Sequence, residues 1–146
     1  MKPWVVDASV AAKWVLPAVD EPFALEAQAI LAQLRREEIT LIVPDLFWSE
    51  LANVLWSAVR RDRISNDHAR QGMEEVLWLG LRTFPSTPLI AHALDLALKH
   101  GRTAYDSLYL ACAMEVNGSF LTADEKLVNS LGTYFPVRWL GALSLL

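Results

Sequence analysis

The stretch "WVVDAS" at residues 4–9 decides the fold class. Trp4, Val5 and Val6 form the short, β-branched, apolar run that is typical of a buried strand. Asp7 and Ser9 follow at once, and both are residue types that begin helices by capping them. The next residues, "SVAAKWVLP", predict a brief helix that Pro17 ends. A strand that runs directly into a helix is the opening unit of a parallel α/β domain.

The rest of the chain repeats this alternation. We expect further strands at residues 40–45, 119–122 and 136–140, and an edge strand or loop at 83–88, where two prolines stand. Helical patterns predict helices at 21–38, at 45–63 with an acidic cap, at 65–82 with a serine cap, at 89–101 ending at Gly101, at 103–116, and from about 123. No repeat or linker interrupts the series. The sequence therefore predicts one α/β sandwich domain spanning residues 1–146.

Composition limits the kinds of function. With 17 acidic and 13 basic side chains the net charge is −4, so the chain as a whole is not suited to coating nucleic acid. A phosphate-bearing substrate would need a local basic patch and a bound cation. The single cysteine excludes an intramolecular disulfide and predicts a reducing, cytoplasmic location. Charges at Asp7 and Lys13 argue against a signal peptide, and no apolar run approaches the ~18 residues of a membrane span.

Carboxylates stand where this fold places its chemistry. The segment "TAYDSLYLACAM" (103–114) reads as a core helix except for Asp106. Asp7 ends the first strand, Asp124 follows the strand at 119–122, and Glu50 lies about one turn into the second long helix. Parallel strands present their carboxyl ends at one rim of the sheet. We therefore expect these four acids to converge there.

Four converging acids need a compensating charge. One pair ~4 Å apart repels by about 4 kcal/mol at an effective dielectric near 20. A divalent cation would remove this cost, and oxygen ligands without a histidine or cysteine cluster favour Mg²⁺ or Mn²⁺ over zinc. The predicted metal ligands and catalytic residues are Asp7, Glu50, Asp106 and Asp124.

Four segments carry a resemblance: "VVDAS", "PDLFWSELANVL", "TAYDSLYLACA" and "LTADEKL". In this order and spacing they resemble the four acidic motifs of PIN-domain nucleases, most closely the VapC-type toxin ribonucleases of toxin-antitoxin pairs. The resemblance implies a PIN-like α/β/α sandwich with a short central parallel sheet and about seven helices. It also implies an endoribonuclease dependent on Mg²⁺ or Mn²⁺. Ser9 and Thr122 match supporting hydroxyl positions, and Asn53 is a further supporting candidate on the polar strip beside Glu50.

The same resemblance implies partners and a mechanism. The partners are an RNA substrate, an antitoxin protein bound in an apolar groove beside the acids, and a second copy of the chain in a homodimer. Asp124 or Glu50 would orient or deprotonate the attacking water, leaving a 5′-phosphate and a 3′-hydroxyl. Phosphates also need cationic contacts. The candidates for substrate binding are Lys13, Arg60, Arg61, Arg63, Arg102 and Lys126.

The sequence also allows simpler interpretations of these residues. Asp7 and Asp106 could be ordinary helix-capping or first-turn acids, and Glu125 could face the site in place of Asp124. One alternative function is a phosphoacceptor signalling domain, which would require a lysine at the end of the last strand. Two others are a metal-binding interaction module without catalysis and a stand-alone nuclease that acts on DNA or other nucleic acid. The acids alone do not distinguish ribose from deoxyribose.

Overall fold

Among the residues that the structure describes, five parallel strands form one sheet in the order β3-β2-β1-β4-β5. The computed structural model describes residues 3–143. The strands are β1 (Trp4–Val6), β2 (Leu41–Pro44), β3 (Arg82–Phe84), β4 (Ser119–Thr122) and β5 (Val137–Trp139). The predicted parallel α/β fold with a short central sheet is confirmed.

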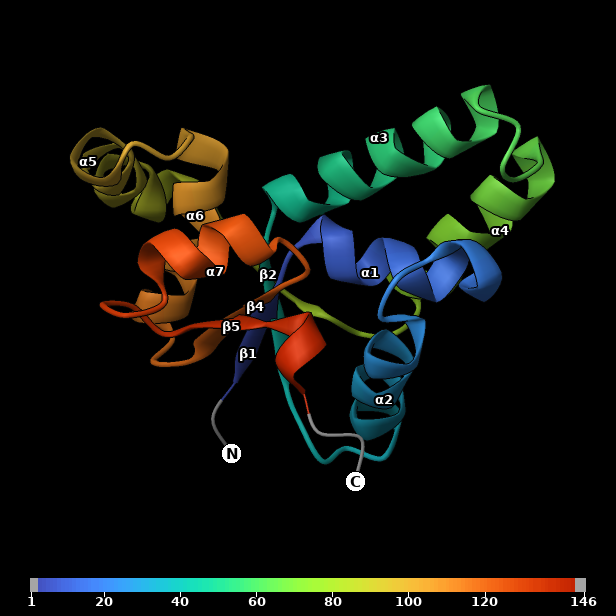
Figure 1. Cartoon of the computed structure of the whole chain (residues 1–146), viewed down its shortest axis with the longest axis horizontal. Helices are drawn as coiled ribbons and strands as arrows, with labels where there is room; N and C mark the ends of the chain where they lie inside the picture. Colours follow the sequence, from blue (N-terminus) through green and yellow to red (C-terminus); the bar gives the residue numbers. More distant parts are fainter. Residues whose placement is uncertain (1–2, 144–146) are drawn as a thin grey trace.

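Seven α-helices lie among the described residues: α1 (Ala8–Val15), α2 (Ala24–Arg35), α3 (Leu46–Arg60), α4 (Asn66–Leu77), α5 (Ile90–His100), α6 (Ala104–Glu115) and α7 (Glu125–Leu131). Short 3₁₀ turns occur at Ala18–Asp20, Thr87–Leu89 and Leu140–Ala142. Helices α1 to α4 lie on one side of the sheet and α5 to α7 on the other (Figure 1). Right-handed crossovers produce this division, because the chain moves from β1 toward β3 in one direction and from β3 to β4 and β5 in the other.

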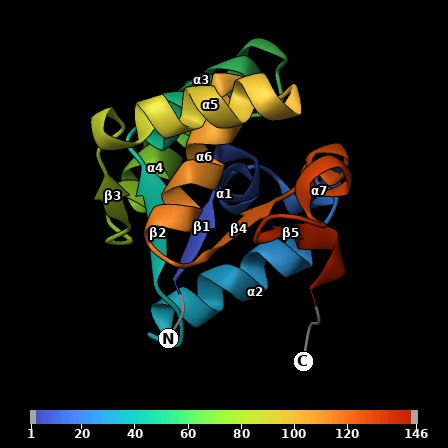
Figure 2. The ribbon, with the colours of Figure 1, turned by 90° about the vertical axis from the view of Figure 1, so that its left-hand side faces the viewer.

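Helix α6 is the central helix of its layer. It contacts β1, β2 and β4 and is covered on its outer side by α5 (Figure 2). Every residue from Ser107 to Ala113 is buried, and the ring of Tyr109 stacks on Phe120 of β4 with 5.5 Å between ring centroids. This position explains why residues 103–114 read as core. Asp106 belongs to the first turn, where the helix emerges at the rim of the sheet.

Several element boundaries differ from the sequence-based predictions. Helix α2 begins only at Ala24, because Phe23 takes a left-handed conformation with φ of 59° after a 3₁₀ turn. Asp45 precedes α3 but makes no capping bond to it, since its carboxylate instead accepts hydrogen bonds from Ser86. Residues 78–82 are predicted in a helix, but α4 ends at Leu77 and Arg82 begins β3, an edge strand paired with β2. Ser65 and Gly101 cap α4 and α5 as predicted.

Within residues 3–143, no helix combines the length and the apolar character needed to cross a membrane.

Candidate active site at the switch point of the sheet

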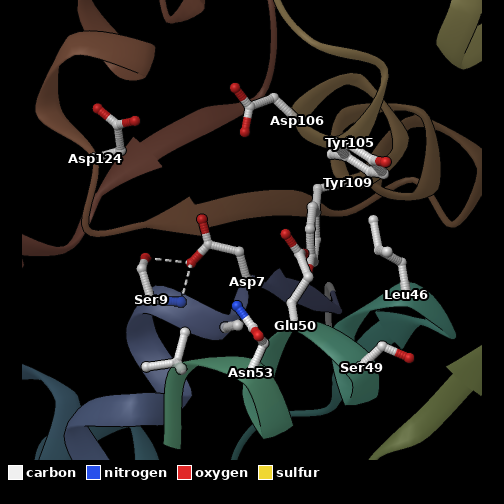
Figure 3. A pocket seen from close by; sticks show the side chains of 12 residues that line it. Asp7, Ser9, Leu46, Ser49, Glu50, Asn53, Tyr105, Asp106, Tyr109 and Asp124 are labelled. Carbon is white, nitrogen blue, oxygen red and sulfur yellow. Dashed lines mark hydrogen bonds between the residues drawn. The ribbon is translucent and has the colours of Figure 1, made fainter. Parts of the chain in front are cut away.

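A pocket of about 510 Å³ opens at the carboxyl ends of β1 and β4. These neighbouring strands are the point where the direction of the chain through the sheet reverses, which is where open α/β folds bind ligands. Side chains from α1, α3, α6 and the start of α7 surround the pocket (Figure 3). The lining residues are Asp7, Ala8, Ser9, Leu46, Ser49, Glu50, Asn53, Val54, Tyr105, Asp106, Tyr109 and Asp124. All four predicted acids are among them.

Asp7 is held more firmly than the other acids. It is the N-cap of α1, and its Oδ1 accepts hydrogen bonds from the backbone N–H of Ser9 (3.1 Å) and Val10 (3.3 Å) and from the Ser9 hydroxyl. Its Oδ2 accepts from the hydroxyl of buried Thr122 at 2.6 Å. The carboxylate of Asp7 therefore has two roles, because it caps the N-terminus of α1 and also faces the pocket.

Burial raises the pKa of Asp7 from 3.8 to about 6, although the bonds from Ser9, Thr122 and Val10 act in the opposite direction. The negative charge of Glu50 adds a smaller upward contribution. The raised value means that the charged carboxylate is poorly compensated by the protein itself. A positive charge in the pocket would stabilise it.

Glu50 depends on a tyrosine for its position. The hydroxyl of Tyr109 donates a hydrogen bond of 2.6 Å to Oε1 of Glu50, so α3 and α6 are joined across the pocket. Tyr109 is buried, and burial together with the neighbouring carboxylate raises the pKa of its phenol far above the ordinary value. The phenol is therefore a permanent donor, and it fixes one oxygen of Glu50.

Asp106 and Asp124 both lie close to the side chain of Arg102. A guanidinium nitrogen of Arg102 lies 3.5 Å from Oδ2 of Asp106 and 3.9 Å from Oδ2 of Asp124. The Nε of Arg102 is buried and has no hydrogen-bond partner among the described residues. Asp124 also caps α7 by accepting from the N–H of Leu127 at 3.1 Å. These two acids are less enclosed than Asp7, and they are compensated by an arginine.

The hydroxyl positions link the two strands of the site. Thr122 donates to Asp7 and its oxygen accepts from the N–H of Asp124, while the Ser9 oxygen accepts from the N–H of Ala123 at 3.2 Å. Asn53 lines the pocket on α3. Asp124 faces the pocket and Glu125 is not among its lining residues.

The donor set fits a hard divalent cation in chemical type. The acidic and polar groups lining the pocket are carboxylates, hydroxyls and one carboxamide, and no histidine or cysteine is among them. Within residues 3–143, however, no three histidine, cysteine, aspartate or glutamate side chains are close enough together to form a metal site as they stand. Two of the four carboxylates, Asp106 and Asp124, are instead paired with Arg102.

The predicted substrate-binding residues are dispersed. Lys13 and Arg63 both pair with Glu21, at 3.4 and 2.9 Å, and Lys13 is buried. The guanidinium of Arg60 lies 5.0 Å above the ring of Trp56. The remaining two, Arg61 and Lys126, are exposed on the surface. Arg102 is the member of this group that contacts the acids of the site.

Sequence reasoning missed Tyr105 and Tyr109. Both line the pocket, and they stand one helical turn apart on α6. Their spacing around Asp106 was a usable signal, because residues at i and i+4 share a helix face. Their apolar neighbours concealed it, since tyrosine in such a segment is ordinarily a core residue.

Comparison with known proteins agrees with this geometry. The family model of the PIN domain matches residues 4–129. The chain is 36% identical over 126 residues to a protein named Ribonuclease VapC3 from Pyrobaculum aerophilum, which covers 84% of this chain and 90% of the relative. It is 31% identical over 129 residues to Ribonuclease VapC1 from Mycobacterium tuberculosis, covering 88% and 90%.

Solved structures share the architecture. PAE2754 from Pyrobaculum aerophilum superposes with a TM-score of 0.67 at 25% identity, over 88% of this chain and 79% of that one. FitAcB from Neisseria gonorrhoeae gives a TM-score of 0.63 at 17% identity, over 96% and 99%, and shows likeness of fold alone. With a family match over most of its length and a fold and acidic pocket to accompany it, this chain belongs to the PIN-domain family.

Proposed function

We propose that this protein is an endoribonuclease dependent on Mg²⁺ or Mn²⁺ and the toxin of a type II toxin-antitoxin pair. The observation that carries the proposal is that Asp7, Glu50, Asp106 and Asp124, from four distant segments, line one pocket at the switch point. Two relatives that carry the name ribonuclease, at 36% and 31% identity, support the reaction class.

The chain's own residues suggest a division of roles. Asp7 accepts four hydrogen bonds within the protein, so its position is fixed and it is suited to be a ligand of the cation. Glu50 has one oxygen fixed by Tyr109, and its Oε2 accepts no hydrogen bond from residues 3–143. Glu50 is therefore the better candidate to orient or deprotonate the attacking water, with Asp124 as the alternative.

The four acids would hold the cation, with Ser9, Asn53 and Thr122 in support. A bound divalent cation would lower the pKa of a water molecule in the site and would offset the negative charge that develops on the phosphate during hydrolysis. Arg102 would then be released from Asp106 and Asp124 and become available to a phosphate oxygen. The proposed outer contacts to the RNA backbone are Arg60, Arg61 and Lys126. Lys13 and Arg63 would join them if their ion pairs with Glu21 open.

The proposed partners are a cognate antitoxin and a second copy of this chain. Exposed apolar side chains offer surface for both, among them Trp56 on α3 and Leu94 and Leu98 on α5. A cytoplasmic location completes the proposal and rests on the use of a single, buried cysteine, Cys112. Purification of the chain together with the product of the adjacent reading frame would test the first partner, and light scattering would test the second.

A cleavage assay tests the reaction directly. The purified chain is incubated with single-stranded RNA, duplex RNA and DNA of the same sequence, in Mg²⁺, in Mn²⁺ or in EDTA. We expect metal-dependent cutting of RNA that is lost in Asp7→Asn and in Asp106→Asn. The matched control is Asp67→Asn, because Asp67 is a fully exposed acid on α4 outside the pocket.

The outcomes separate the candidate functions. Cutting that survives both substitutions would exclude this pocket as the active site. Preferential cutting of DNA would identify a nuclease of different substrate class, and metal binding by calorimetry without any cutting would identify a silent interaction module.

A further inference from the structure

A second cavity adjoins the acidic pocket. It has a volume of about 380 Å³, within the usual range of ligand-binding pockets. Its lining residues are Asp45, Leu46, Ser49, Ser86, Ile90, Ala104, Tyr105 and Leu108. Leu46, Ser49 and Tyr105 line both cavities, so one wall is common to the two. A ligand in the acidic pocket and a ligand in the second cavity would therefore contact the same three residues.

Tyr105 is the aromatic residue of that common wall. Its side chain is 64% exposed, although Tyr109, one turn further along α6, is only 2% exposed. Figure 3 shows the Tyr105 ring beside the pocket, between Leu46 and Asp106. The fold does not require this ring for its core. Ile90 on the same cavity is also 49% exposed, so apolar surface is available to a ligand.

We propose that the second cavity is a nucleobase subsite, in which Tyr105 stacks on the base next to the phosphate held at the acidic pocket. This inference rests on the proposed function, because it takes the ligand to be an RNA strand. Aromatic side chains stack on any base, so the contact supplies affinity without selecting a sequence. Ser49 and Asp45 provide polar groups for the edge of the base, and hydrogen bonds from Ser86 lower the pKa of the Asp45 carboxyl.

The charge distribution favours a contact that does not depend on phosphates. The chain has a net charge of −4, and Lys13 and Arg63, two of its candidate phosphate contacts, are paired with Glu21. Stacking on aromatic side chains is a second source of affinity for a single strand beside contacts to phosphates. Bases in an A-form duplex are stacked on one another and are not available to a side chain. The substrate is accordingly single-stranded at the nucleotide that occupies this subsite.

Binding in the absence of cleavage tests the subsite. Fluorescence anisotropy is measured in EDTA with labelled 12-nucleotide oligo(A) and oligo(U), an abasic oligomer of equal length, and an RNA duplex. Relative to wild type, Tyr105→Ala is expected to bind both single strands about 5- to 140-fold more weakly, which corresponds to about 1–3 kcal/mol per stacked base. Tyr105→Phe retains the ring and should stay within about twofold of wild type. Abasic oligomer and duplex should bind the wild type and Tyr105→Ala equally.

Two results would overturn the subsite. One is equal affinity of wild type and Tyr105→Ala for the single strands. The other is a change of Tyr105→Ala from dimer to monomer in light scattering that accounts for all of its weaker binding, which would make this surface a contact between copies of the chain. Single-strand binding that depends on Tyr105, in a protein that never cuts RNA with any metal, would support the subsite and refute the proposed function.

Discussion

Replacing Asp7 with asparagine should abolish RNA cleavage and yet stabilise the metal-free protein at neutral pH. Burial raises the pKa of Asp7 from 3.8 in the unfolded chain to about 6 in the fold. A difference of about two pKa units corresponds to about 3 kcal/mol. Because the folded-state pKa is the higher one, the contribution of Asp7 to stability is complete below about pH 4 and is lost as the pH rises through about 6. An asparagine at this position carries no such cost.

The assay is urea unfolding in EDTA at pH 4 and at pH 8. Asparagine can still accept the capping bonds of α1, so we expect Asp7→Asn to match the wild type at pH 4. At pH 8 it should exceed the wild type by about 1–3 kcal/mol, since the uncharged amide is buried at lower cost. Asp124→Asn is the matched control, because Asp124 also caps a helix but its side chain is 48% exposed. That variant should resemble the wild type at both pH values.

Adding Mg²⁺ provides the second half of the test. A cation at 100 times its Kd stabilises the folded state by about 2.7 kcal/mol, and this gain should be larger in the wild type than in Asp7→Asn. The advantage of the variant at pH 8 should then shrink or reverse. A variant that is less stable than the wild type at pH 8 in EDTA, or a difference that is the same at both pH values, would refute the reasoning.

Three further substitutions have defined outcomes. Tyr109→Phe removes the hydroxyl that donates to Glu50 and should lower the free energy of unfolding in urea by about 1–3 kcal/mol. It should also lower the affinity of the protein for Mn²⁺ in calorimetry. Unchanged Mn²⁺ affinity and cleavage would show that this hydrogen bond contributes to stability alone. Glu21→Ala leaves the buried Lys13 without its partner and should destabilise the fold by about 3 kcal/mol in urea unfolding, and an unchanged midpoint would contradict the observed pairing. Gly72→Ala would place a Cβ 2.3 Å from Val15 and should lower stability by about 1–3 kcal/mol in the same assay, and an unchanged midpoint would contradict the close packing of α1 and α4.

The fold class and the location of the acids could be predicted from the sequence because both depend on local patterns. Val5 and Val6 are buried in a strand and Asp7 caps the helix that follows, as their residue types indicate. In a parallel sheet the ends of strands share one rim, so acids at strand ends were bound to be neighbours. The boundaries of α2 and α4 were less predictable, since a left-handed residue at Phe23 and the pairing of β3 with β2 depend on tertiary contacts.

Charge pairing could not be predicted in the same way. Lys13 and Arg102 are both basic residues close to an acidic motif, and nothing local distinguishes them. In the fold Lys13 lies buried against Glu21, whereas Arg102 lies against Asp106 and Asp124. Glu21 is eight residues from Lys13, and Arg102 has one partner four residues away and another 22 residues away. The more distant partners depend on how other elements pack around a long side chain.

The sequence by itself determined the order of strands and helices, the four acids and the family to which they point. Only the tertiary structure decided that Tyr109 fixes Glu50, that Arg102 compensates two of the acids, and that Tyr105 stands exposed between two cavities. The physical reason is that capping and hydrophobic periodicity act over a few residues. Burial, hydrogen bonding across helices and the shape of a pocket instead depend on residues that are distant in the chain.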